Sequence, residues 1–161
     1  TRRMSGSAGV GLLRSENANV AALTTGGTSG GILRMIRVPS NCYIKAVYWG
    51  VDATVTTVDC DVGLYYSDVL DGTKPANVTA ANTPIDADFF ASAVDMKTIT
   101  TAWQQVTFEG GAYLPSESNT VLWSAAGLTA DPGGFFDVCF TTTSTTSGAP
   151  VLSCRVDYVT P

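Results

Sequence analysis

Apolar and polar side chains alternate along most of the chain after residue 31, in short runs that end at turn residues. One example is the run Val58, Cys60, Val62 and Leu64, whose intervening side chains include Asp59 and Asp61. Because successive side chains of a strand point to opposite faces, this period predicts half-buried β-strands. We predict seven or eight short strands, among them residues 32–38, 42–51, 57–66, 103–108, 120–125, 135–143 and 151–159.

The spacing of these strands predicts an all-β fold, a two-sheet antiparallel β-sandwich. No amphipathic helical pattern follows residue 24, and a long connection with the apolar insert Phe89-Phe90-Ala91 spans residues 71–97. Such a crossover favours a jelly-roll or Greek-key arrangement over a simple meander. The predicted core comprises Val58, Val62, Leu64, Val106, Phe108, Val121, Val138, Phe140, Leu152 and Val156.

Residues 1–31 have a different composition from the rest of the chain. They contain seven glycines and no aromatic residue, and 26–31 reads Gly-Gly-Thr-Ser-Gly-Gly. Such a segment cannot bury enough apolar area to order itself. We therefore predict two parts, an extended, flexible N-terminal arm over 1–31 and a β-sandwich domain over 32–161. The arm is expected to become ordered only against a neighbouring subunit or an underlying shell.

Charge changes the picture of possible partners. Charged residues make up 14% of the chain, against roughly 25% in an average domain, and the net charge is −5. Residues 46–161 hold three bases and thirteen acids, so this body should repel nucleic acid. The basic residues Arg34, Arg37 and Lys45 either lie on a solvated face of a strand or attract the N-terminal part of the chain to an anionic surface. No run is long enough to cross a membrane, and no membrane partner is expected.

The four cysteines allow disulfides, but strand parity argues against the most obvious pair. In 135–140 the apolar face is Phe136, Val138 and Phe140, whereas in 151–158 it includes Cys154 itself. If both apolar faces point into one core, Cys139 and Cys154 point away from each other. We predict mostly free thiols, as in a protein assembled in a reducing cytoplasm.

Candidate chemistry is sparse, and we predict no catalytic residue, no cofactor and no metal. The chain has no histidine, which excludes Ser–His–Asp and Cys–His arrangements. Asp59 and Asp61 share one strand face and suit calcium in principle, but a solvated face is the preferred interpretation. The loop acids Asp86, Asp88 and Asp95 have no calcium-specific spacing. Sugar-stacking candidates are Trp49, Trp103 and Trp123, of which at least two are expected to pack in the core.

Three runs carry a resemblance to a known group of proteins. They are residues 61–66 (Asp-Val-Gly-Leu-Tyr-Tyr), residues 86–95 (from Asp86 through Phe89-Phe90-Ala91 to Asp95) and residues 36–47, which contain Pro39-Ser40-Asn41. Together they resemble small virion structural proteins of tailed bacteriophages over roughly residues 32–125. The resemblance implies a capsid decoration or cement protein on the exterior of the particle, commonly a homotrimer on a β-sandwich scaffold.

The resemblance implies the major capsid protein, other virion proteins and copies of the same chain as partners. It transfers no functional residue and does not extend to the arm. From composition alone, we predict that the arm binds a partner through Arg2, Arg3, Leu12, Leu13 and Arg14. The alternative function is a carbohydrate-binding or adhesive β-sandwich module, either a phage tail component or a secreted binding domain. Two exposed, coplanar tryptophans would favour that alternative.

Overall fold

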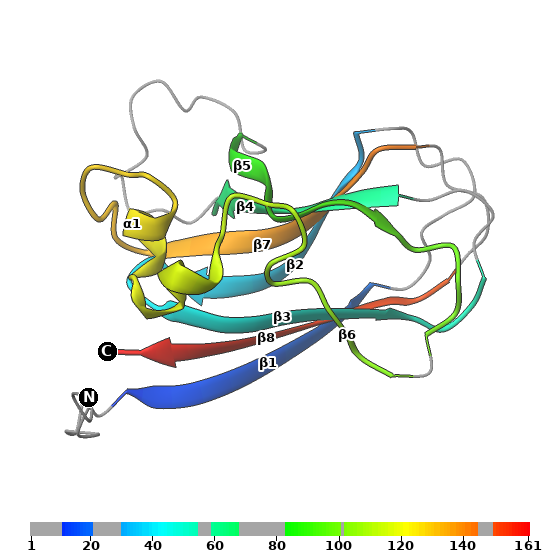
Figure 1. Ribbon diagram of the computed structural model, residues 1–161, viewed down its shortest axis with the longest axis horizontal. Helices are drawn as coiled ribbons and strands as arrows, with labels where there is room; N and C mark the ends of the chain where they lie inside the picture. Colours follow the sequence, from blue (N-terminus) through cyan, green and yellow to red (C-terminus); the bar gives the residue numbers. More distant parts are fainter. Residues whose placement is uncertain (1–10, 21–29, 55–58, 68–82, 101, 145–149) are drawn as a thin grey trace.

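The computed structural model describes residues 11–20, 30–54, 59–67, 83–100, 102–144 and 150–161, which form two layers of β-sheet (Figure 1). Sheet A has the strand order β1-β8-β3-β6, and sheet B has the order β2-β7-β4-β5. The strands are β1 (Leu12–Val20), β2 (Ile32–Pro39), β3 (Tyr43–Val51), β4 (Asp59–Tyr66), β5 (Pro84–Asp95), β6 (Gln104–Gln105), β7 (Phe135–Thr142) and β8 (Leu152–Thr160). Two short helices, η1 (Pro115–Asn119) and α1 (Leu122–Ala125), lie between β6 and β7.

The pairing of strands follows a nested pattern. β1 pairs with β8, β2 with β7, β3 with β6 and β4 with β5, all antiparallel. Additional pairs of β3 with β8 and of β4 with β7 complete the two sheets. This is the order produced when one long antiparallel hairpin is rolled into two facing sheets, the eight-stranded jelly roll. The predicted all-β sandwich with jelly-roll topology is therefore confirmed.

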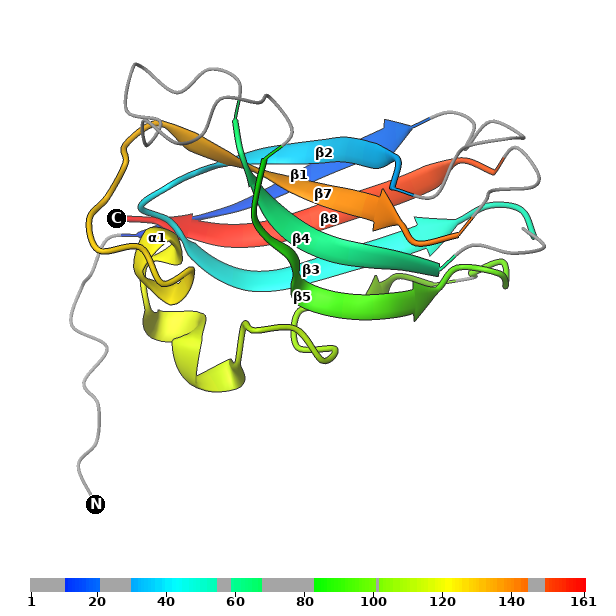
Figure 2. The ribbon, with the colours of Figure 1, turned by 90° about the horizontal axis from the view of Figure 1, so that it is seen from above.

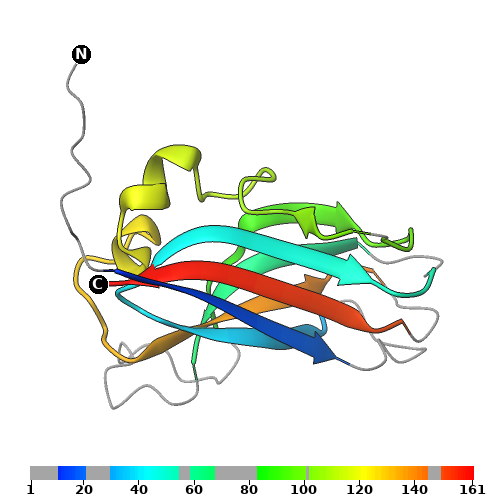
Figure 3. The same cartoon turned by 90° about the horizontal axis from the view of Figure 1, so that it is seen from below.

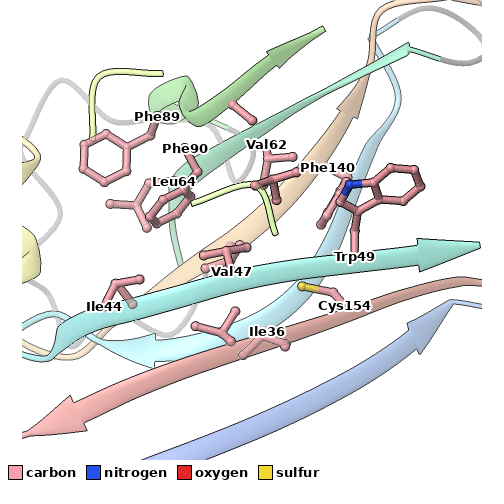
Figure 4. Close-up of a cluster of buried hydrophobic side chains, with 14 of the residues drawn as sticks. Ile36, Ile44, Val47, Trp49, Val62, Leu64, Phe89, Phe90, Phe140 and Cys154 are labelled. Carbon is pink, nitrogen blue, oxygen red and sulfur yellow. The ribbon is translucent and has the colours of Figure 1, made fainter. Parts of the chain in front are cut away.

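The core lies between the sheets and takes one face of each strand. Figure 4 shows Val47, Trp49 and Cys154 of sheet A pointing toward Val62 and Phe140 of sheet B. Viewed from above, the strands of the two sheets cross at an angle, as expected for packed, twisted sheets (Figure 2). Seven members of the predicted core are buried: Val62, Leu64, Val106, Val138, Phe140, Leu152 and Val156.

Two members of the predicted core do not lie there. Phe108 is 37% exposed and stacks on Tyr113 instead, because strand pairing stops at Gln105. Val121 is only half-buried, since it precedes helix α1 rather than lying in a strand. Val58 lies outside the described residues.

The prediction of a strand over residues 120–125 is wrong. Residues 122–125 form α1, whose first residue, Leu122, is fully buried. The backbone N–H groups of Leu122 and Trp123 donate to the carbonyls of Cys42 and Ser40, at 2.8 and 3.0 Å. These bonds fix the helix across one end of the sandwich (Figure 1). Tertiary contacts thus override a weak alternation in a segment whose good helix formers are Leu122 and Ala125.

The connection over 71–97 also contains more structure than the sequence indicates. Its second half is β5, which buries Phe89, Phe90 and Ala91 against β4. The pairing of β4 with β5 contains three register shifts, so its side chains do not follow a simple alternation. In the sequence, an irregular strand of this kind resembles an apolar insert in a loop.

Part of the predicted flexible arm is a strand of the sandwich. Residues 12–20 form β1, paired with β8 over nine registered positions from Leu12↔Thr160 to Val20↔Leu152. β1 lies at the edge of sheet A and is largely exposed. The physical reason is that β8 otherwise presents an unpaired edge, and backbone pairing alone can hold a strand there. Residues 1–10 and 21–29 lie outside the described residues, so the boundary at residue 31 stays a prediction.

Candidate interaction surface

The outer face of sheet A is a broad surface formed by alternate side chains of β1, β8 and β3. Figure 3 looks onto this side of the molecule, and no described element lies over these strands. Strand register arranges its side chains in cross-strand rows. We call this surface the A face and define it by Leu13, Ser15, Asn17, Asn19, Tyr43, Tyr48, Gly50, Trp103, Ser153, Arg155, Asp157 and Val159.

The centre of the A face holds an aromatic–guanidinium group. The guanidinium carbon of Arg155 lies 4.1 Å from the centre of the Tyr48 ring and 5.6 Å from that of Trp103. Tyr48 and Arg155 are paired across β3 and β8, which fixes this geometry. Arg155 also donates through Nη2 to Asp157 Oδ2, at 3.3 Å. The ion pair makes the group nearly neutral, and Tyr, Trp and Arg are the residues enriched at the energetic centres of interfaces.

Trp103 borders a shallow depression next to this group. The depression has a volume of about 280 Å³ and is lined by Gly50, Val51, Asp52, Thr100, Ala102, Trp103 and Ser153. Trp103 is 42% exposed, the Asp52 carboxylate accepts the backbone N–H of Val151 at 2.7 Å, and Thr100 bonds to the backbone of Val51. An exposed aromatic ring beside a concave surface suits a protruding apolar side chain of a partner protein.

An apolar row lies at the other end of the A face. Leu13, Val159 and Tyr43 are paired across β1, β8 and β3. Leu13 is 64% exposed, and its neighbour Leu12 is 58% exposed. Leu12 has the opposite strand parity, so the contiguous apolar area of this row is that of Leu13, Val159 and Tyr43, and such an area marks an interaction site.

The residues predicted to bind a partner through the arm divide into two groups. Leu12, Leu13 and Arg14 lie in β1 and are exposed, which leaves them available for contact. Arg14 occupies the position opposite Tyr158, so its strand parity is that of the inward-facing side chains. Arg2 and Arg3 lie outside the described residues. That these five residues bind a partner stays a prediction.

Two ion pairs within the chain lie on the outer face of sheet B. The side chain of Asp137 is 4% exposed and accepts from Arg34 Nη1 and from Arg37 Nε, the latter at 3.0 Å. Arg34 also donates to the backbone carbonyl of Tyr66 at 3.2 Å. The side chains of Arg34 and Arg37 are 23% and 42% exposed, so they remain partly solvated as one of the two interpretations expected, and both pair with a buried carboxylate of the same chain.

The structure describes all four cysteines as free and buried, and the expected absence of a Cys139–Cys154 bond is confirmed. The predicted opposite orientation of the two side chains holds, but the strands do not share a sheet. β7 and β8 belong to different sheets, so Cys139 lies on the outer face of sheet B whereas Cys154 points into the core from sheet A. Burial raises the pKa of Cys42 and of Cys60 to about 12, which keeps both thiols protonated and unreactive near neutral pH.

The predicted sugar-stacking residues do not come together. Trp49 is buried in the core and Trp123 packs against it, whereas Trp103 is exposed at the A face. Core packing of two of the three tryptophans is thus confirmed. The pair of exposed, coplanar rings that would favour glycan binding is not formed by these residues.

The candidate calcium ligands are engaged in other contacts. Asp59 accepts from Lys97 Nζ at 3.0 Å, and Asp61 accepts the backbone N–H of Ala93 at 2.8 Å. Asp86 accepts the backbone N–H of Asp88 at 3.3 Å, and Asp95 accepts that of Lys97 at 2.9 Å. Within the described ranges, no group of three or more acidic or cysteine side chains could hold a metal ion. None of the described helices is long and apolar enough to span a bilayer.

The A face was not singled out by the sequence. Tyr48 and Arg155 each lie in a predicted strand, on the side opposite the apolar face, but they are far apart in the chain. Only the pairing of β3 with β8 brings them together. The available signal was parity, which places both side chains on an outer face without showing that they share it.

Comparison with known proteins adds the context of the fold. No family model matches the chain, and no curated protein matches it significantly. Among solved structures, a chain of the capsid of Ralstonia phage GP4 is similar, with a TM-score of 0.60 and 13% identity, covering 99% of this chain and 92% of that chain. A chain of the capsid asymmetric unit of cyanophage Pam1 has a TM-score of 0.46 and 15% identity, covering 100% of this chain and 94% of that chain. The chain thus shares its jelly-roll fold, over nearly its whole length, with a protein of a phage capsid.

Proposed function

We propose that this chain is a non-enzymatic structural protein of a bacteriophage particle, which decorates the capsid exterior and stabilises it. It does so by binding the major capsid protein and its own copies, as a homotrimer assembled in the host cytoplasm. The observation that carries the proposal is the match to the GP4 capsid chain over almost all of both chains. The match extends over the whole chain rather than over one part of it, which supports a capsid role for the chain.

The surface chemistry supports a role in binding other proteins. The A face combines an aromatic–guanidinium centre, an apolar row and a low net charge, the features of a protein–protein contact. The thiols of Cys42 and Cys60 are buried with raised pKa values, so they are poor nucleophiles. The chain has no histidine, which supports the proposed non-enzymatic role.

The proposal is tested by adding the purified chain to particles assembled without it. We expect saturable binding in stoichiometric amounts, with the added chain accessible to antibody on intact particles. A double substitution, Tyr48→Ala with Trp103→Ala, should weaken binding at least about tenfold, because central aromatic contacts dominate interface energies. Phe135→Ala is the matched control, since Phe135 is 41% exposed and Trp103 is 42% exposed, but Phe135 begins a strand of sheet B.

Two results would count against the proposal, each in a different way. If the unaltered chain does not bind such particles, the capsid role is wrong. If the chain binds and the double variant binds equally well while Phe135→Ala weakens binding, the contact lies on sheet B and not on the A face.

A further inference from the structure

Strand β1 is held to the rest of the molecule mainly by its backbone. Its nine residues pair in register with β8, but seven are exposed and two are half-buried. Among its side chains, Ala18 is the one that packs against the core cluster. By contrast, Leu152, Cys154 and Val156 of β8 are fully buried. β1 therefore completes sheet A without being an integral part of the core.

Two side-chain hydrogen bonds also join β1 to β8. Ser15 Oγ donates to Asp157 Oδ1 at 2.6 Å, and the Tyr158 hydroxyl donates to Glu16 Oε1 at 2.5 Å. These bonds and the backbone pairing keep the same geometry whether β1 belongs to the same chain or to a neighbouring one. Such identical contacts are the condition for exchange of a strand between copies.

The chain between β1 and β2 is long enough for exchange. Eleven residues, 21–31, connect Val20 with Ile32. Gly30 and Gly31 are hydrogen-bonded to Thr142, and the other nine residues would span about 30–32 Å if fully extended, at roughly 3.3–3.6 Å per residue. Packed sheets lie only about 10 Å apart, so this length greatly exceeds what is needed to join β1 to β2 within one subunit. Four of the eleven residues are glycines, which lack a side chain and permit many backbone conformations.

Pairing of β1 with its own sheet leaves apolar area uncovered. Leu12 and Leu13, at the start of the strand, are 58% and 64% exposed. Exchange would keep the pairing of β1 with β8, and the two leucines would stay available to a further partner such as the capsid surface.

We propose that in the assembled protein β1 of one copy pairs with β8 of a neighbouring copy, so that each subunit completes sheet A of the next. The arrangement links subunits by backbone hydrogen bonds and needs no additional folded element. This inference rests on the self-association part of the proposed function. It names the segment that carries that association.

Cross-linking between two singly substituted chains tests the exchange. Asn19 and Ser153 are opposite each other on β1 and β8, on the outer face, and the native thiols are buried. Asn19→Cys and Ser153→Cys would be placed on separate full-length chains, coexpressed and treated with a short bismaleimide. We expect a covalent heterodimer, because only exchange brings Cys side chains at these positions of two different chains together.

A chain carrying both substitutions provides the complementary measurement. Under exchange, it should form covalent oligomers up to the size of the closed ring. A chain with Tyr43→Cys and Val159→Cys, paired across β3 and β8, is the control and should cross-link only within itself.

Monomer-length products from the doubly substituted chain would overturn the exchange, as would the absence of a heterodimer. Failure to cross-link at all would show that β1 does not pair with β8 in this register, which also overturns it. Because no particle enters the experiment, its result is distinct from the outcome of the particle-binding test.

Discussion

Burial of the cysteine thiols makes the stability of the protein sensitive to alkaline pH. Desolvation raises the pKa of Cys60 from 9.0 to about 12, with smaller contributions from Asp61 and Asp59. Above about pH 9 the unfolded chain loses this proton while the native chain retains it. The native state then binds more protons, so the free energy of unfolding falls as pH rises from about 9 to about 12.

We expect Cys60→Ala to make this decline shallower. One fully shifted thiol contributes a slope of about 1.4 kcal/mol per pH unit, and its removal should reduce the slope by roughly that amount. Urea unfolding between pH 8 and 11 measures it. Val62→Ala is the control: it should lower stability at every pH through loss of packing and leave the slope unchanged. Equal slopes for Cys60→Ala and the unaltered protein would contradict the argument.

A second residue-scale prediction concerns the buried carboxylate on sheet B. Asp137→Asn removes the charge that compensates Arg34 and Arg37 and should lower the free energy of unfolding by about 1–3 kcal/mol. Asp157→Asn, which alters a more exposed ion pair with Arg155, should cost about 0–1 kcal/mol. Urea titration of both variants checks the ranking, and an equal loss for the two would refute it.

At the scale of elements, the close approach of the β5 backbone to β4 depends on the absence of a side chain at one glycine. A Cβ on Gly63 would lie 2.2 Å from the carbonyl oxygen of Ala87 and 2.5 Å from that of Asp86. Because both atoms belong to the backbone, the strand itself would have to move. Gly63→Ala should therefore destabilise the protein by about 1–3 kcal/mol or more.

Thermal unfolding of Gly63→Ala, compared with Gly50→Ala, measures this effect. A Cβ on Gly50 would meet only the Thr100 hydroxyl, at 3.0 Å, which is the end of a side chain. The Gly50 variant should thus lose much less stability. If the two variants have the same midpoint of thermal unfolding, the close approach of β5 to β4 does not constrain the fold.

The strands that the sequence predicts well are those with a clean alternation and a buried face, such as β4, β7 and β8. Irregular elements escape this reasoning: β5 is interrupted by register shifts, and α1 is fixed by hydrogen bonds to Ser40 and Cys42, remote in sequence. β1 escapes for a different reason. Its composition predicts no strand, but the unpaired edge of β8 supplies backbone hydrogen-bond partners for it.

At the scale of the whole molecule, alternation alone could not establish which strands are neighbours. The A face depends on β1, β3 and β8, from opposite ends of the chain, and pairing across such separations leaves no local signal. The aromatic–guanidinium centre could therefore not be predicted from the sequence. Strand parity did predict that Tyr48 and Arg155 each lie on an outer face. The buried positions were accessible because burial follows from one strand at a time.

The assembly should depend on β1 far more than the folding of a single subunit does. Deleting residues 1–28 removes β1, which contributes only Ala18 to the packing around the core, so the remaining sandwich should still fold. Its stability should decrease, because the edge of β8 loses its partner. Attachment to particles should weaken much more strongly, since both the exchanged strand and the A-face row containing Leu13 are lost.

Deletion of residues 1–10 is the matched control for that truncation, because it removes Arg2 and Arg3 but retains β1. Thermal unfolding reports on the subunit, and binding to particles assembled without the chain reports on attachment. If binding falls only in the longer deletion, β1 carries the attachment, whereas an equal fall in both assigns it to the first ten residues. Unchanged binding in both would exclude the N-terminal segment from the mechanism, and loss of folding in the longer deletion would show that β1 is indispensable to the sandwich.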